Sequence, residues 1–390
     1  MFGLQVNATI SISQTEIMEN IMKRFITVIL LITNMPWLYA SKQELSEQTK
    51  HDLELVQIFK DYSKQASGSF VTVGGDSLGC QFDNIQDAID SIPFSGTGEI
   101  RIATNKTYNE NLVINDINVS LIGGYDDCFD AGLPFPPSSS QALIDGGNND
   151  SVIKIIGDFV DKTILLKNLR VIEGLGNAPN GNPTGGGILS YRTTAEILLN
   201  NVDVRNNDAV FGAGISIIGG NTSLVILTSL IINNLAQTGA GIYCLGSNSN
   251  IVMADNSGII ANVANGVPIS AGDITGNGAG LFLRSCDFTL YSGSENDGLV
   301  GINSNIAFNH GGGIFADGNT NIRLRNNRSC LSGVCLGNDR NPPKMEGNIA
   351  GFNSTSGNGG AIYATGTIEK GSAVFLYGSL IEGNSAVIHG

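Results

Sequence analysis

The stretch EILLNNVDVRNNDAVFGAGISI, residues 196–217, contains every part of a short structural repeat. Apolar residues recur at every second position over 197–199 and 202–204, an Asn pair follows, and three small residues at 212–214 precede another apolar segment. This pattern is typical of strands only a few residues long, bounded by tight turns. Strands so short do not make a stable hairpin meander, but they can be stacked on copies of themselves.

A tetrad of three small residues and one apolar residue recurs six times along the chain. Its apolar residue is Ile188, Ile215, Ile242, Leu281, Ile314 and Ile362. Glycine adopts a positive φ at little steric cost, so the tetrad suits a sharp corner that every copy of the repeat must turn. We therefore predict an all-β fold, a right-handed parallel β-helix over residues 69–390, in which each coil lies on the one before.

Asparagines recur beside the corners, each about three residues after an apolar residue. Asparagine tolerates a left-handed turn conformation, and stacked Asn amides can hydrogen-bond from coil to coil. The predicted ladder consists of Asn207, Asn234, Asn262, Asn309, Asn353 and Asn384.

The two ends of the stack differ in sequence. DNIQDAIDSI, residues 83–92, places Ile85, Ala88, Ile89 and Ile92 at helical spacing, with Asp83 and Gln86 in a capping-box arrangement. This pattern predicts a short amphipathic helix that caps the N-terminal end of the stack. Residues 382–390 contain no comparable pattern, so we expect an uncapped C-terminal end.

The first forty residues resemble an export signal. Lys23 and Arg24 precede an apolar run at 25–33 that is short for a membrane span, and Ala40 offers a small residue for cleavage. We predict an upstream extension and signal peptide over 1–40, with translation starting at Met22; a membrane anchor at the same place is the alternative. Residues 41–68 are expected to form a polar linker or loose helix. We expect the mature chain to contain no transmembrane helix. The protein would then be secreted, or held at the outer membrane or cell surface.

Charge and cysteine content restrict the function further. The net charge of −14 disfavours nucleic-acid binding, which requires a clustered basic face. Six cysteines in an exported chain favour disulfides. We expect Cys80 to pair with Cys128 and Cys244 with Cys286, while Cys330 and Cys335 bracket a four-residue loop.

The tetrads at 311–314 and 359–362, with the dipeptide FN at 308–309 and 352–353, resemble the repeats of the chlamydial polymorphic membrane proteins. That resemblance implies an adhesin, whose β-helical surface binds a host or neighbouring cell surface, matrix or glycans. The Asn turn departs from the family pattern because it reads Ile-x-x-Asn where the family has Phe-x-x-Asn.

Residues 85–89, 100–114 and 121–123 resemble the opening of pectin esterases and lyases, of the pectin lyase-like fold. This second resemblance implies the alternative function, a polysaccharide lyase or esterase acting on acidic glycans. Such chemistry requires carboxylates that converge on one groove. Asp203 and Arg205 align with the apolar residues Leu230 and Ile232 of the next repeat, so carboxylates do not stack from coil to coil. No catalytic or cofactor-binding residue is therefore assigned.

A few residues and loops remain as candidates for a site. Asp126, Asp127 and Asp130 could bind calcium, or form a solvated turn held by Cys128. His310 could act as a general base, or be only a turn residue. Loops at 173–184, 265–278 and 338–348 are expected to project from the stack, where a binding surface could form.

Overall fold

The computed structural model describes residues 47, 49–54 and 57, and residues 70–386 except for 76–78, 135–136, 158–161, 177–183, 267–274, 292–300, 327–328, 332–333, 337–341, 353–356, 366–371 and 378. The chain divides into two compact units, Met1–Thr49 and Lys50–Gly390, and all that follows concerns the second. The predicted signal peptide lies outside the described residues.

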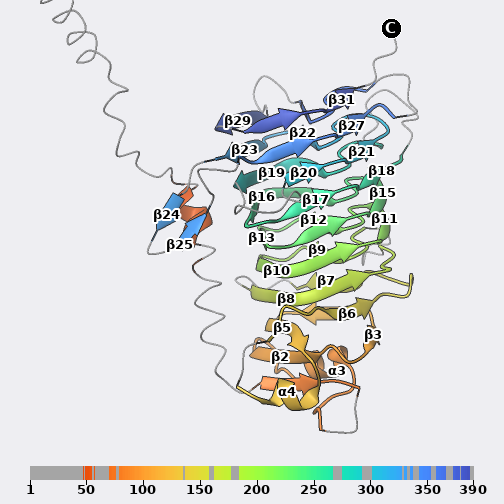
Figure 1. The fold of residues 1–390 in the computed structure, drawn as a ribbon, viewed down its shortest axis with the longest axis vertical. Coiled ribbons are helices and arrows are strands. Elements are labelled where there is room, and N and C mark those ends of the chain that lie inside the picture. The colour runs from red at the N-terminus through yellow and green to blue at the C-terminus, as the bar shows by residue number, and fades with distance from the viewer. Residues whose placement is uncertain are drawn as a thin grey trace, which may run out of the picture. The chain divides into compact units, whose positions relative to one another are not determined.

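The second unit is a right-handed parallel β-helix, as the repeats predict (Figure 1). Its larger sheet consists of β1 (Phe70–Val73), β2 (Thr97–Ala103), β3 (Thr107–Asn109), β4 (Leu112–Asn115), β5 (Asn118–Tyr125), β6 (Ala142–Asp145), β7 (Ile153–Ile156), β8 (Lys162–Ile172), β9 (Ile188–Tyr191), β10 (Ala195–Arg205), β12 (Ile215–Ile218), β13 (Ser223–Leu227), β14 (Leu230–Ile232), β16 (Ile242–Ala254), β17 (Gly258–Ile260), β19 (Leu281–Tyr291), β20 (Gly301–Asn303), β22 (Ile314–Asp317), β23 (Asn321–Arg325), β26 (Lys344–Glu346), β28 (Ile362–Ala364), β29 (Ala373–Tyr377) and β30 (Leu380–Glu382).

A second sheet runs along another side of the stack. It consists of β11 (Asp208–Phe211), β15 (Leu235–Thr238), β18 (Val263–Ala264), β21 (Ile306–Ala307), β27 (Ile349–Ala350) and β31 (Ser385–Ala386). The remaining elements are α3 (Ile85–Asp90), α4 (Cys128–Gly132) and a hairpin of β24 (Ser329–Leu331) and β25 (Val334–Leu336). From β11 onward the coils contribute strands to both sheets, and corresponding strands pair in parallel with those of the next coil.

The tetrads lie in one column, as predicted, because each apolar tetrad residue pairs with its counterpart in the next coil. The first glycine of all six tetrads has a φ between 62° and 66°. The third residue of the tetrad approaches the next coil so closely that a Cβ on Gly241 would lie 2.4 Å from the carbonyl oxygen of Gly280. The tetrad is therefore glycine-rich for two reasons, a left-handed turn and a close contact between backbones.

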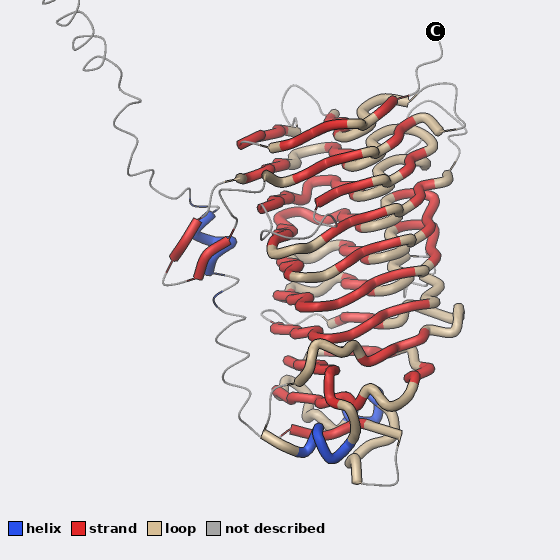
Figure 2. The backbone as a smooth tube through the Cα atoms, viewed as in Figure 1, coloured by secondary structure: helices blue, strands red, loops and turns tan. Residues whose placement is uncertain are grey.

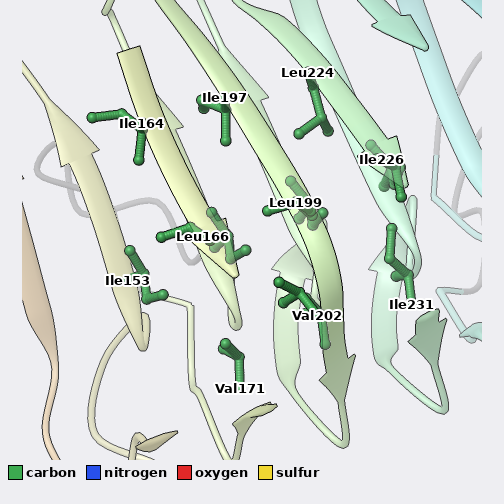
Figure 3. Packing of buried hydrophobic residues seen from close by; sticks show 14 of the residues in the cluster. Ile153, Ile164, Leu166, Val171, Ile197, Leu199, Val202, Leu224, Ile226 and Ile231 are labelled. Carbon is green, nitrogen blue, oxygen red and sulfur yellow. The ribbon is translucent and has the colours of Figure 1, made fainter. Parts of the chain in front are cut away.

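The interior of the stack is a continuous apolar core. Ile164, Ile197 and Leu224 come from three successive coils and are in register with one another, and Figure 3 shows them in line. All three are almost fully buried, as are their neighbours in the cluster. Burying a side chain of this size contributes about 1.5–3 kcal/mol. The core therefore grows by the same few side chains with every coil.

The Asn ladder forms, but with two members other than those predicted. Each ladder Asn donates from Nδ2 to Oδ1 of the next, over 2.8–3.0 Å, and from its backbone N–H to the same oxygen. Its members are Asn207, Asn234, Asn262, Asn305, Asn348 and Asn384.

The prediction of Asn309 as a ladder member was wrong, because Asn305 takes that place, while Asn348 holds the place predicted for Asn353, which lies outside the described residues. The residue before each ladder Asn has a φ between 53° and 63°, and Ser304 adopts it before Asn305. The ladder residues from Asn207 to Asn348 are also buried, so they hold the coils together and form no Asn-rich outer face.

Helix α3 closes the N-terminal end, as predicted, with Ile85, Ala88 and Ile89 buried against the core. The capping box between Asp83 and Gln86 does not form, since Asn84 is the N-cap residue and its side chain makes no capping bond. Instead Glu110, from the loop before β4, accepts hydrogen bonds from the backbone N–H groups of Ile85 and Gln86, both at 2.9 Å. A carboxylate at this end also complements the helix dipole.

Two disulfides connect parts of the stack, and both pairings are those expected. Cys80 bonds to Cys128, and Cys244 to Cys286 between the adjacent strands β16 and β19. Alternation along β19 would turn Cys286 outward, yet it is buried in the core. The reason is Ser285, whose φ of 58° interrupts the alternation. In the hairpin, Cys330 and Cys335 are backbone partners.

A segment near the N-terminus packs on the outside of the stack. Residues 50–54 are helical, within the stretch expected to be a linker or loose helix. The buried carboxylate of Asp52 accepts hydrogen bonds from Tyr291 Oη at 2.9 Å and Asn250 Nδ2 at 3.2 Å. These partners lie on β16 and β19, so the contact fixes the helical segment to the outer face of those strands.

Replacing Gly241 with alanine tests the corner. The new methyl group meets the carbonyl oxygen of Gly280, and we expect Gly241→Ala to lower the free energy of unfolding by about 1–3 kcal/mol. Gly132→Ala is the matched control, because nothing lies within 4 Å of its Cβ position. Urea unfolding followed by circular dichroism measures both variants. Equal midpoints for the two would contradict the close contact.

The Asn ladder is tested by comparing a central with a terminal member. Asn262→Ala removes the acceptor of both donors of buried Asn234, and each unsatisfied group costs about 1–3 kcal/mol. Asn384→Ala lies at the partly exposed end, where water replaces the lost bonds. Thermal unfolding should therefore show a clearly larger drop in Tm for Asn262→Ala. Similar drops would mean that the ladder is not buried as described.

Candidate functional site

The second sheet is built from a triplet, Asn-x-Ala, that occurs once in each of six coils. It appears at 207–209, 234–236, 262–264, 305–307, 348–350 and 384–386. The Asn is the ladder residue, the Ala points into the stack, and the residue between them points outward. The prediction of the Asn ladder did not use this triplet. It distinguishes Asn305, which begins a triplet, from Asn309, which does not.

The inner side of this sheet admits only small residues. Ala209 and Ala236 pack against the tetrad alanines Ala213 and Ala240 in a cluster separate from the main core. Ala264 and Ala307 form the same kind of cluster one and two coils further on, with Ala279. The sheet therefore lies directly against the tetrad column, and larger apolar side chains have no room on its inner side.

Larger apolar side chains lie on its outer side instead. We call Leu235, Val263, Ile306 and Ile349 the apolar column; they are in register on four successive strands, about 4.8 Å apart. Leu235 is exposed and the other three are partly exposed. The strands that carry them, β15, β18, β21 and β27, follow one another along one side of the stack in Figure 1. The column is thus a continuous apolar strip open to solvent.

Aromatic and amide side chains lie beside the apolar column, two or three residues after the column residue of the same coil. Phe308 and Phe352 follow Ile306 and Ile349, and their ring centroids lie 5.6 Å apart at a tilt of 47°. Gln237 and Asn265 occupy the matching place in the two coils before, and both are exposed. The surface therefore combines apolar area, ring edges and faces, and amide groups that both donate and accept hydrogen bonds.

The outer face of the larger sheet carries aromatic residues as well, but they are closed to ligands. Tyr243, Phe282, Phe315 and Tyr363 form a ladder with centroids 5.0–5.5 Å apart, and Phe211, at the end of β11 in the second sheet, lies 5.2 Å from Tyr243. The three central rings are buried, and burial raises the pKa of Tyr243 above its ordinary value. Since their faces contact each other, these rings stabilise the stack and offer little surface to a ligand.

Several charged side chains on the outside of the stack are paired with each other. The carboxylate of Asp203 accepts a hydrogen bond from Arg205 and lies 3.5 Å from Arg170, both on its own side of the sheet. Asp287 pairs with Arg323 at 3.1 Å, and Asp317 with Arg284 at 2.7 Å. Each of these carboxylates thus has a cationic partner on the surface of the stack.

The predicted calcium residues lie at the start of α4. Asp127 is its N-cap residue, and Oδ1 accepts a hydrogen bond from the backbone N–H of Asp130 at 2.9 Å. Asp126 is exposed. Among the residues that the structure describes, no group of three or more His, Cys, Asp and Glu side chains is arranged to hold a metal ion. Calcium binding at this turn remains a prediction.

His310 is engaged in the corner of its coil. Nδ1 accepts a hydrogen bond from the backbone N–H of Asn358 at 3.1 Å, and the ring stacks on Tyr363 with centroids 4.6 Å apart. Partial burial lowers the pKa of His310 below its ordinary 6.5. These contacts fit the interpretation of His310 as a turn residue that joins two coils.

The three predicted binding loops lie partly outside the described residues. Residues 177–183, 267–274 and 338–341 are the undescribed parts of these loops. Residues 265 and 266 are described and follow directly after β18. In the described part of the chain, no helix is both long and apolar enough to cross a membrane.

Comparison with known proteins returned solved structures only. Two crystal structures of the pectin methylesterase from Aspergillus niger are similar, at 15% and 14% identity, with TM-scores of 0.30 and 0.28. Each comparison covers 68% of this chain and 81% of the esterase. No protein-family model and no curated protein matches the chain. The resemblance to chlamydial polymorphic membrane proteins therefore stays a prediction.

The protonation of His310 should make stability depend on pH. Because its pKa is lower in the folded than in the unfolded state, the unfolded state binds the proton first as the pH falls below 6.5. The wild type should lose stability between pH 7.5 and about pH 5 relative to His310→Gln, which retains an acceptor but does not titrate. Urea midpoints of both proteins across this range test it; a constant difference between them would contradict the lowered pKa.

Proposed function

We propose that the protein is exported and acts as a binding protein of the adhesin type, attaching to glycans of a cell surface or matrix. The observation that carries this proposal is the open outer face of the second sheet. There the apolar column lies beside Phe308, Phe352 and two exposed amides, on a backbone fixed by the Asn ladder.

The chemistry of this face suits carbohydrate. A sugar ring has apolar C–H surfaces, which pack on aromatic and aliphatic side chains, and hydroxyl groups, which exchange hydrogen bonds with amides. Phe352 and the apolar column would supply the first kind of contact, and Gln237 and Asn265 the second. Because the coils repeat at about 4.8 Å, an extended glycan could contact several of them at once.

Three further features are consistent with an exported protein. The Cys80–Cys128 and Cys244–Cys286 disulfides are of a kind that forms and persists in oxidising compartments. The net charge of −14 keeps an elongated stack soluble and discourages binding to other polyanions. The N-terminal signal peptide predicted from residues 1–40 is consistent with the same route.

Truncating Phe352 tests the proposed face. Purified protein is applied to a glycan array and to cultured cells, and Phe352→Ala is compared with Phe129→Ala, which removes an exposed ring from α4 at another part of the stack. We expect Phe352→Ala to weaken binding about tenfold or more, as a central aromatic contact does, and Phe129→Ala to leave it unchanged.

Three results would contradict the proposal. The wild type would bind nothing above background, or Phe352→Ala would bind as well as Phe129→Ala. The third is esterase or lyase activity on pectin or alginate that both variants retain in full, which would favour the polysaccharide-processing alternative. Circular dichroism of each variant confirms that loss of binding does not come from unfolding.

A further inference from the structure

The strands β16 and β19 bury side chains on their outer face as well as on their inner face. Asn250 and Val252 of β16 and Thr289 and Tyr291 of β19 point outward, because the residues that alternate with them belong to the core. Successive strands lie side by side here (Figure 2), and Val252 is in register with Thr289. Asn250 is nevertheless 6% exposed and the other three are 0% exposed. Another part of the chain therefore covers this face.

The helical segment of residues 50–54 lies on this face. Its Asp52 accepts hydrogen bonds from Tyr291 Oη at 2.9 Å and from Asn250 Nδ2 at 3.2 Å. Asp52 and the next residue, Leu53, are both 0% exposed, so a carboxylate and an apolar side chain are enclosed together. We call residues 50–54 the strap. Its seat consists of Asn250, Val252, Thr289 and Tyr291.

The strap leaves part of the seat unsatisfied. Asn250 Oδ1 and Thr289 Oγ1 are buried, and neither has a hydrogen-bond partner among the residues that the structure describes. Burying a polar atom without a partner opposes closure of the strap, since water would satisfy both atoms in an open seat. The contact therefore suits a segment that can leave the seat better than a permanent brace.

The strap also shows which chemistry the seat accepts. Tyr291 and Asn250 donate to a carboxylate, and an aliphatic side chain is enclosed next to it. A peptide with an acidic residue followed by leucine has both groups, whereas a sugar acid has hydroxyl groups in place of the aliphatic side chain. A donor of such a peptide could in addition reach Asn250 Oδ1, which the strap does not use.

We propose that residues 50–54 are an autoinhibitory strap, and that the open seat binds a protein partner through a segment with an acidic residue followed by leucine. The partner segment takes the place of Asp52 and Leu53. The seat lies on the larger sheet and the apolar column on the second sheet, so this site is separate from the proposed glycan-binding face and does not depend on it.

A labelled peptide with the sequence of residues 47–57 serves as the probe, in a fluorescence-anisotropy titration with the full chain. The wild type should bind it weakly, because its own strap fills the seat. Asp52→Lys in the chain opens the seat and should lower the dissociation constant of the peptide about tenfold or more. Asp126→Lys, which alters an exposed aspartate near α4, is the matched control and should behave as the wild type.

A second variant tests the seat without altering the strap. Tyr291→Phe removes one donor to Asp52, and trypsin should then cleave after Lys50 about tenfold faster, as mass spectrometry of the fragments would show. Tyr191→Phe, which removes a hydroxyl group from β9, is the control and should leave the rate unchanged.

Three results would overturn the proposal. The peptide would bind the Asp52→Lys chain no better than the wild type, or a peptide that itself carries Asp52→Lys would bind that chain as well as the unaltered peptide. The third is cleavage after Lys50 at the same rate in Tyr291→Phe and Tyr191→Phe, which would mean that the strap is not held by this contact.

Discussion

The stacking of like residues in successive coils is the constraint on which the rest of this structure depends. Coils follow each other at the spacing of paired strands, so each buried residue has its own counterpart as neighbour. A buried polar group can then be satisfied by the equivalent group of the next coil. Asn234 shows this: its backbone N–H and its amide both donate to Asn262 Oδ1, and Asn262 repeats the arrangement with Asn305. The intervening loop lengths differ, because the constraint acts only where coils touch.

The outside of the stack is free of this constraint, which is why its faces differ so much. One carries the buried aromatic ladder around Phe282, another the ion pairs around Asp203, and the second sheet carries the apolar column. All three rest on the same interior. The activity of the protein therefore cannot be inferred from its β-helical fold, and function has to be argued from the side chains of one face.

The sequence predicted the architecture because the residue types of the tetrad reflect the conformation of the corner. Its first glycine has a positive φ, and its third residue lies against the backbone of the next coil. The sequence predicted the Asn ladder less well. Asn305 and Asn309 both follow an isoleucine by three residues, so that spacing alone does not separate them; the Asn-x-Ala triplet does, and Ser304 before Asn305 has a φ of 56° that serine does not announce in the sequence. The inward turn of Cys286 depends in the same way on Ser285. What decides these positions is contact with the neighbouring coil, which no single repeat contains.

The second sheet inverts the usual placement of apolar residues, because its larger apolar side chains lie on the outer side and only alanine lies on the inner side. Its inner positions hold alanine because the tetrad column leaves no further room, so the core gains nothing from the size of the residue between Asn and Ala. A polar residue is tolerated at the position between Asn and Ala, as the end strands show. There β11 has Asp208 and β31 has Ser385, whereas the middle strands have apolar residues such as Leu235 and Ile306. The fold therefore does not require the apolar column, and leaving such a strip open to water is unfavourable. The proposed binding partner would cover the strip, and so would account for apolar residues that the packing of the chain itself does not explain.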